Sequence, residues 1–376
     1  MFKRSRLLQI FFLSLLPATM AGIATAQEMR TERAILKVVT LAQGLDHPWG
    51  LAFLPDGRLL VTERAGRMRI IERDGKVGTP LANVPAVVAQ GQGGLLDVLL
   101  DRQFATNRTL YFSYAEAGAH GVGTSVARAR LGAAGLEDLR VIFRQSPKVR
   151  GGLHFGSRIV QARDGNLFVT LGERYQRELA QELGNHLGKL VRIRPDGQVP
   201  PDNPFVGRAG ALAEIWSYGH RNVQGAALHP GTGDLWTVEH GAQGGDEINR
   251  PLAGRNHGWP VITYGRDYSG AGIGEGTAKA GMEQPLYYWD PSIAPSGLAF
   301  YDGDAIPGWK GSLLVGSLKF RLLSRLELDG NRVVREERLL QSLGERIRDV
   351  RVGPDGLVYL LTDSSDGRVL RLEVAR

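Results

Sequence analysis

The sequence of 376 residues contains no cysteine. This absence excludes disulfide bonds, thiolate zinc sites, cysteine nucleophiles and covalent c-type haem. A bound metal would need oxygen or imidazole ligands instead. Candidate metal ligands are therefore sought among acids, amides, histidines and backbone carbonyls.

Long runs of one charge sign are absent as well. The chain has 46 Lys and Arg residues against 39 Asp and Glu residues, a formal net charge of +7, and the two signs alternate along it. This pattern is typical of a solvated surface and does not indicate a nucleic-acid groove, so no nucleic-acid partner is expected. A basic surface would also suit an acidic electron-transfer partner, although the charge alone does not identify one.

A long hydrophobic run is missing everywhere except at the N-terminus. Basic residues at positions 3, 4 and 6 precede the apolar run Leu7–Leu16, and Ala24–Ala26 fits a small-residue cleavage site. A run of about ten residues is too short to span a bilayer comfortably, so residues 1–26 are interpreted as a signal peptide; a membrane anchor is the alternative. We expect the mature chain to be exported and not membrane-spanning, with the bacterial periplasm as its natural location.

One pattern recurs six times after Gln27: an apolar run, a turn of the Pro-Asp-Gly kind and a second apolar run. Each copy predicts a β-hairpin, and further β-rich runs follow most copies. Four strands in each repeat of about sixty residues predict an all-β fold, a single six-bladed β-propeller over residues 27–376. A pair of β-sandwiches agrees less well with sequential, similar repeats. The six copies begin at Trp49, Gly94, Ser157, Gln224, Ser296 and Asp349.

Two smaller expectations concern the elements outside the hairpins. The only convincing helix is a short one within Glu178–Leu187. The early strand Ala34–Leu41 is expected to close the ring against the last blade.

The segment Gly219–Pro260 carries the densest set of polar residues. Its loop Gly241–Glu247 combines glycines, which expose carbonyls, with acids that suit calcium. Arg221 and Asn222 supply a planar donor fork and an amide, which suit an anionic or quinonoid ligand. The alternative is a solvated surface loop with a structural arginine.

Polar residues also flank the other hairpins, and the loops at one end of a propeller converge on its axis. Cations gathered there would repel one another without an anionic ligand, and a planar, multiply charged small molecule suits such a site. The alternatives are that His154 is a structural histidine in a turn, and that Arg346 and Arg348 form a surface ladder on one strand face with Asp349 as their partner. The set comprises Gln92, His154, Arg221, Asn222, Lys319, Arg346 and Arg348.

Several short motifs, in this order and spacing, give the chain a family resemblance over nearly all of residues 30–376. The chain resembles the soluble aldose dehydrogenases that use pyrroloquinoline quinone, the glucose/sorbosone dehydrogenase family. The motifs are Gly91–Leu96, His154 with Ser157–Ile159, Gly219–Gly225, Asp246–Asn249, Asn256–Pro260, Ser317–Lys319 and Arg346–Asp349.

The resemblance implies a catalytic pair. His154 would be the general base that takes the proton of the sugar C1 hydroxyl while hydride passes to the quinone. Glu173 is our candidate for the carboxylate that orients it. Arg221 would lie over the reacting quinone carbonyl and stabilise the charge that develops there.

The remaining site residues follow from the same resemblance. Asn222, Lys319, Arg346 and Arg348 would hold the cofactor carboxylates and carbonyls. Gln92 would contact substrate or cofactor, and Tyr268 would line the substrate cleft. A packing or turn role is the alternative for Tyr268.

Two calcium ions are implied. One would bridge the quinone and the carbonyls of Gly241 and Ala242, where a proline is usual in place of Ala242. The second would use the Glu247 carboxylate and the main-chain carbonyl of His257, where a tyrosine is usual. Because that second site supports a dimer in the glucose-specific members, a monomer or a homodimer is expected.

The resulting prediction is oxidation of aldose sugars to lactones, with electrons passed to an unidentified acceptor. The chain is shorter than the glucose-specific enzymes and looks closer to the aldose sugar dehydrogenase branch. Two alternatives are a calcium-dependent propeller lactonase and a non-catalytic binding propeller. A lactonase site needs carboxylates and asparagines on the axis, whereas the candidates here are mostly cationic.

Overall fold

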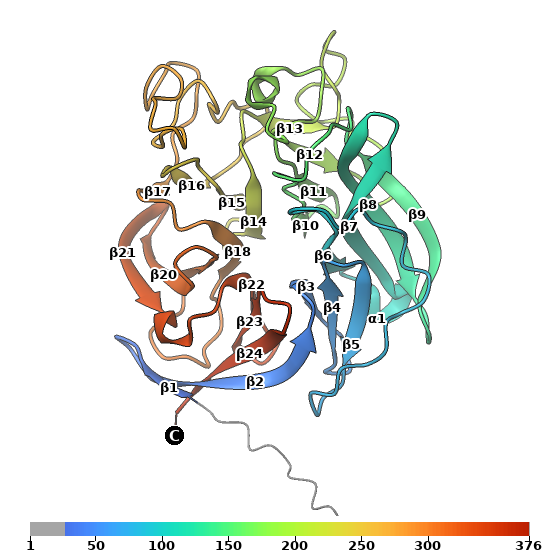
Figure 1. Ribbon diagram of the computed structural model, residues 1–376, viewed down its shortest axis with the longest axis vertical. Helices are drawn as coiled ribbons and strands as arrows, with labels where there is room; N and C mark the ends of the chain where they lie inside the picture. The colour runs from blue at the N-terminus through green and yellow to red at the C-terminus, as the bar shows by residue number, and fades with distance from the viewer. Residues whose placement is uncertain (1–26, 376) are drawn as a thin grey trace, which may run out of the picture.

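The computed structural model describes residues 27–375, which form six β-sheets arranged as blades around a central axis (Figure 1). The predicted six-bladed β-propeller is thereby confirmed. The predicted signal peptide, residues 1–26, lies outside the described residues. None of the helices in residues 27–375 combines the length and apolarity that crossing a bilayer requires.

The hairpins predicted from the sequence form the two inner strands of each blade. In the first five blades the strands follow one another in sequence and pair antiparallel. The strands of these blades are β3 (Pro48–Phe53), β4 (Leu59–Glu63), β5 (Arg67–Ile71); β6 (Leu95–Leu100), β7 (Thr109–Gly118), β8 (Gly121–Leu131), β9 (Leu136–Arg144); β10 (Ile159–Gln161), β11 (Leu167–Thr170), β12 (Lys189–Ile193), β13 (Ile215–Tyr218); β14 (Val223–Leu228), β15 (Leu235–Glu239), β16 (Asp246–Asn249), β17 (Tyr287–Trp289); β18 (Pro295–Phe300), β19 (Leu313–Ser317), β20 (Leu322–Asp329) and β21 (Arg332–Leu339).

The two ends of the chain close the ring in the sixth blade. Strands β22 (Ile347–Val352), β23 (Val358–Thr362) and β24 (Gly367–Val374) are joined by β2 (Ile35–Leu45) and β1 (Gln27–Arg30). Strand β2 pairs antiparallel with β24, with Val38 opposite Leu372, so the expected closure is confirmed. The expectation of four strands per blade holds for four blades only, because the first has three strands and the last has five.

The helices differ from the expectation. A short helix α1 (Phe104–Asn107) occupies a segment that the sequence suggested was a plain turn. In place of a helix over Glu178–Leu187, a single 3-10 segment spans Arg177–Gln181, because Glu182 already has extended backbone angles. A second 3-10 segment spans Gln341–Leu343.

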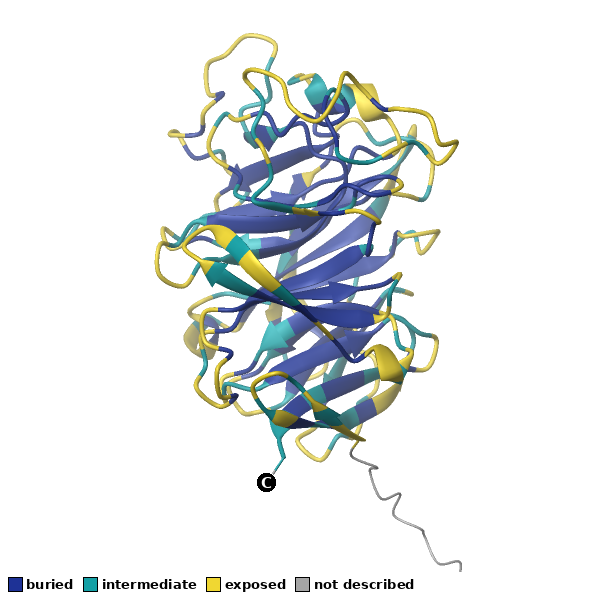
Figure 2. Ribbon diagram, turned by 90° about the vertical axis from the view of Figure 1, so that its left-hand side faces the viewer, coloured by how far each residue is buried: buried dark blue, intermediate teal, exposed yellow. Residues whose placement is uncertain are grey.

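The six larger hydrophobic clusters of the described residues form layers, one between each pair of neighbouring blades. Middle strands such as β4, β12 and β23 are buried at every position, because the neighbouring blades cover both of their faces. Figure 2 shows these buried strands stacked through the molecule, with exposed residues in the connecting loops. Since side chains from the blade faces fill the layers, the polar loops at the axis are left to form a site.

Candidate functional site

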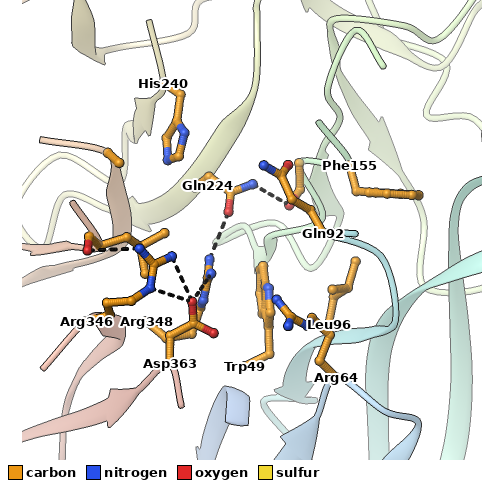
Figure 3. A pocket seen from close by; sticks show the side chains of 13 residues that line it. Trp49, Arg64, Gln92, Leu96, Phe155, Gln224, His240, Arg346, Arg348 and Asp363 are labelled. Carbon is orange, nitrogen blue, oxygen red and sulfur yellow. Dashed lines mark hydrogen bonds and ion pairs between the residues drawn. The ribbon is translucent and has the colours of Figure 1, made fainter. Parts of the chain in front are cut away.

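An axial cavity of about 270 Å³ receives side chains from all six blades. Figure 3 shows how its polar side chains face a common space. Three predicted residues, Gln92, Arg346 and Arg348, are in its wall, so residues distant in sequence do share one pocket. The full lining is Trp49, Arg64, Gln92, Leu96, Phe155, Gly156, Gln224, His240, Ala294, Leu318, Arg346, Arg348 and Asp363.

Cations outnumber anions in this wall. Asp363 Oδ2 lies 3.0 Å from Nη2 of both Arg346 and Arg348, and Arg64 adds a third guanidinium. Burial alone would raise the pKa of Asp363, but the charges of Arg348, Arg346 and Arg64 hold it well below its usual range. Arg348 Nη1 also donates to Gln224 Oε1 at 3.2 Å, whereas its buried Nε has no partner within residues 27–375. One carboxylate against three guanidiniums leaves the cavity ready for an anionic ligand.

Asp349 does not pair with Arg346 and Arg348, in contrast to the ladder considered from the sequence. It belongs to a second, nearly buried network with Asp97, Arg158 and Arg351, in which Arg158 Nη1 lies 2.9 Å from Asp97 and 3.0 Å from Asp349. Two acids and two arginines balance in charge and tie β6, β22 and the start of β10 together. The Arg158 guanidinium lies 4.4 Å from the ring centre of Trp49, so this network supports the wall of the cavity.

His154 and Glu173 form a buried pair beside the cavity. Nδ1 of His154 lies 2.6 Å from Glu173 Oε2, and the backbone N–H of His154 donates to Gln92 Oε1 at 2.8 Å. His154 has a φ of 54°, and Gly172 permits the close approach of its carbonyl, since a Cβ there would collide with it. Since Nδ1 is engaged, Nε2 is the nitrogen left for a substrate.

The environment keeps His154 neutral. Burial lowers its pKa most, the Glu173 carboxylate opposes this shift, and the charges of Arg221 and Arg174 lower the pKa further. The net effect is a pKa below the usual value for histidine. A neutral imidazole beside a carboxylate can accept a proton and be stabilised as the cation.

Arg221 and Asn222 lie in the loop before β14, where both are buried. Glu239 holds the loop, because its Oε2 accepts the backbone N–H of Arg221 at 2.7 Å. Asn222 Oδ1 accepts the N–H of Gly156 at 3.1 Å. Arg221 Nε and Asn222 Nδ2 have no partner among the described residues, so two buried donors are free for a ligand.

His240 connects this loop to the cavity that it lines. Burial and the charge of Arg221 lower its pKa to about 3, with smaller contributions from His154 and Arg348. Arg221 Nη1 donates to the backbone carbonyl of His240 at 3.4 Å, and Phe155, the residue after His154, lines the same cavity as His240. The structure thus brings His154 and Arg221 to the same end of the ring as the arginines of the sixth blade.

Five predicted catalytic, cofactor-binding or substrate-binding residues do not line the cavity: His154, Arg221 and Asn222 are buried beside it, whereas Lys319 and Tyr268 are exposed. Lys319 is exposed, and its ammonium lies 5.4 Å from the ring centre of Phe320, although the preceding Leu318 lines the cavity. Tyr268 is 63% exposed on the long loop after β16. Their roles remain predictions.

Three of the expected calcium ligands, Gly241, Ala242 and Glu247, lie at the β15–β16 connection, and His257 lies in the loop after β16. Glu247 stands opposite Glu239 in the two strands, and Asn249 Nδ2 donates to both carboxylates at 3.0 Å. Burial, and then the Glu239 charge, raise the pKa of Glu247 to about 8. Asn249 Oδ1 is buried without a partner among the described residues. Oxygen atoms and unrelieved negative charge fit a calcium ion.

Backbone carbonyls would have to complete both ion sites. In residues 27–375, no three His, Asp or Glu side chains are arranged to hold a metal. The imidazole of His257 is buried and stacks on His220 with ring centres 4.6 Å apart. Both ring nitrogens of His257 are buried without a hydrogen-bond partner among the described residues, and the role of its main-chain carbonyl stays a prediction.

Sequence reasoning missed Arg64, His240 and Asp363 in the cavity wall. Each of them directly follows the second strand of its hairpin, after β4, β15 and β23 respectively. Because equivalent strands end at the same side of a propeller, that position in the repeat was the signal that would have identified them.

Comparisons with known proteins agree with this geometry. Residues 45–371 match the glucose/sorbosone dehydrogenase family. The chain is similar to the aldose sugar dehydrogenase YliI of Escherichia coli (strain K12), with 48% identity over 345 residues, covering 90% of this chain and 93% of that protein. It is also similar to quinoprotein glucose dehydrogenase B of Acinetobacter calcoaceticus, with 26% identity over 433 residues, covering 93% of this chain and 89% of that protein.

Solved structures show the same architecture. The apo form of the soluble aldose sugar dehydrogenase from Escherichia coli superposes with a TM-score of 0.89 at 47% identity, covering 90% of this chain and 100% of that one. The PQQ-bound aldose sugar dehydrogenase from Streptomyces coelicolor gives a TM-score of 0.75 at 29% identity, with 94% and 100% covered. The chain belongs to the glucose/sorbosone dehydrogenase family.

Proposed function

We propose that this protein is a periplasmic oxidoreductase that oxidises the C1 hydroxyl of aldose sugars to lactones, with hydride transfer to calcium-bound pyrroloquinoline quinone. The names of its relatives support the sugar and the quinone. One observation carries the proposal: the His154–Glu173 pair lies beside a cation-rich cavity built by all six blades.

His154 would act as the general base. Glu173 fixes Nδ1, so Nε2 would take the proton of the C1 hydroxyl. The lowered pKa keeps Nε2 free of a proton at neutral pH. The Glu173 carboxylate would then stabilise the imidazolium, as an orienting acid does in other acid–base pairs.

The cavity residues fit the quinone cofactor, which would supply the hydride acceptor. Arg346 and Arg348, aided by Arg64, would hold its carboxylates in charge-assisted hydrogen bonds. The partnerless donors of Arg221 and Asn222 point to further contacts, with Arg221 stabilising developing negative charge.

Three other predicted residues would act around this centre. Gln92 lines the cavity and also holds the backbone of His154, so it would position both ligand and base. Lys319 would add a cation from the rim beside Leu318. Tyr268 would border the sugar entrance from its exposed loop.

Calcium would be held at two places. The carbonyls of Gly241 and Ala242 would bind the ion that polarises the cofactor. Glu247 and the main-chain carbonyl of His257 would bind the second, where a cation offsets the repulsion between Glu239 and Glu247. The electron acceptor is expected to be a separate partner, and the protein a monomer or homodimer.

Reconstitution of the mature protein tests the proposal. With pyrroloquinoline quinone and calcium, the protein should reduce an artificial dye when an aldose is added, and chelation before loading should prevent this activity. Lactone hydrolysis with calcium alone, without quinone-dependent dye reduction, would instead identify a propeller lactonase. Absence of both activities would support a binding role.

A further inference from the structure

Tyr175 combines three features: contact with His154, exposure and a strained backbone. Its ring centre lies 4.9 Å from that of the His154 imidazole, with an angle of 38° between the planes. The residue is nevertheless 54% exposed. Its backbone has a φ of 63°, a left-handed conformation that costs a non-glycine residue free energy.

The turn that presents Tyr175 is held from below. Arg174 is fully buried and donates to the carbonyls of Leu153 and Val122 at 2.6 and 2.5 Å, and its guanidinium lies 3.7 Å from the ring centre of Phe155. The Tyr175 N–H donates to Glu173 Oε2 at 2.8 Å, the same oxygen that holds His154. The ring therefore has a fixed place relative to the base.

The same turn borders the loop of Tyr268. Arg177 Nη2, two residues beyond Tyr175, lies 3.1 Å from Oδ2 of Asp267, which precedes Tyr268. This ion pair joins the turn that carries Tyr175 to the loop that carries the exposed Tyr268. The Tyr175 hydroxyl has no hydrogen-bond partner among the side chains of residues 27–375, so the hydroxyl does not explain why the ring is held there.

We propose that Tyr175 is a sugar-stacking platform, on which the apolar C–H face of a pyranose rests while its C1 hydroxyl meets His154 Nε2. This inference depends on the proposed sugar oxidation and adds a specificity residue to it. A rigid, half-exposed aromatic ring offers large contact area at little cost in conformational entropy. Because the platform and the base share Glu173, a sugar that stacks on the ring would bring C1 to the base.

Three variants separate the ring from its hydroxyl and from the backbone strain. Tyr175→Phe keeps the ring, Tyr175→Ala removes it, and Tyr175→Gly removes it while relaxing the positive φ. In the quinone- and calcium-loaded enzyme, the KM of the Ala and Gly variants for glucose should be about three- to tenfold above that of the parent. Their kcat, and the proton concentration at which kcat falls on the acid side, should stay within about twofold of the parent values. The Phe variant should behave as the parent.

The outcomes are separable. If the parent reduces no dye with any aldose, the proposed function fails before the platform is tested. If the parent turns over and the Ala and Gly variants keep its KM, the platform is overturned. A fall in kcat with an unchanged KM would mean that the ring only positions His154, and a Phe variant as poor as Ala would mean that the hydroxyl binds the sugar.

Discussion

At the scale of single residues, the proposed chemistry depends on one carboxylate oxygen. Glu173 Oε2 accepts a hydrogen bond from the Tyr175 N–H and lies 2.6 Å from His154 Nδ1. The oxygen therefore selects the tautomer with a proton on Nδ1 and leaves Nε2 as an acceptor. Of the groups around His154, Glu173 is also the one that raises its pKa against burial.

Replacing Glu173 by glutamine should separate these effects. Without the carboxylate, burial and the two arginines act unopposed, so the pKa of His154 falls further below its usual value. The acid limb of kcat against pH should move to lower pH, while kcat at neutral pH falls about 10²-fold or more. An acid limb that moves to higher pH would contradict this assignment.

Asp363 provides a second residue-scale prediction. Its pKa is held low in the folded protein, so its contribution to stability is present above the pKa of the unfolded chain and is lost as the pH falls. Asp363→Asn should destabilise the cofactor-free protein at pH 7 by about 3 kcal/mol, because Arg348 remains buried without its carboxylate. Saturating pyrroloquinoline quinone should reduce this loss, which thermal unfolding with and without cofactor measures.

An exposed ion pair supplies the control for that experiment. Asp329 pairs with Arg332 at 3.0 Å where both side chains are more than 70% exposed. Asp329→Asn should change stability by less than about 1 kcal/mol, whether or not the cofactor is present. Equal losses in the two variants would show that Asp363 has no special role in the cavity.

At the scale of elements, the β15–β16 pair connects the expected ion site to the expected catalytic loop. Glu239 at the end of β15 holds the N–H of Arg221, and Glu247 faces it from β16. Glu239 is buried and Glu247 is half-buried opposite it, and desolvation together with the Glu239 charge raises the pKa of Glu247 to about 8. Calcium or a proton between these strands would thus also affect how firmly the Arg221 loop is held.

Glu247→Gln tests this link in calcium-free protein. In the folded protein Glu247 keeps its proton up to about pH 8, whereas in the unfolded chain it ionises near pH 4.5. The free energy of unfolding therefore falls as the pH rises from about 4.5 towards 8. The variant should therefore melt at a higher temperature than the parent at pH 8, with little difference at pH 5. Added calcium should stabilise the parent more than the variant, and a parent that is stabilised no more than the variant would count against the site.

At the scale of the whole molecule, the repeat determined what the sequence could predict. Each hairpin could be predicted because its two apolar runs and its turn are close together in the sequence. The six-bladed ring then followed from the six copies of this pattern. Gln92, Arg346 and Arg348 were found because they precede the first run of a copy. Arg64 and Asp363 were missed because they follow the second strand of a copy, and only the closure of six blades brings that position to the cavity.

Closure also explains why Asp349 does not pair with Arg346 and Arg348, the alternative considered from the sequence. In the sequence it adjoins Arg348, but alternate residues of a strand point to opposite faces. In the ring, Asp349 joins Arg158 and Arg351 across inner strands, and Arg348 turns to Asp363. Sequence neighbours thus serve two separate charge networks.

The central claim is that His154 removes a sugar proton beside a quinone held by the axial cations. The most direct test is anaerobic addition of glucose to the calcium-loaded holoenzyme while the quinone absorbance is followed, in the parent and in His154→Ala. We predict a rapid absorbance change in the parent and, in a variant that binds the cofactor with similar affinity, a change slowed by about 10²-fold or more. A variant that matches the parental rate would contradict the account.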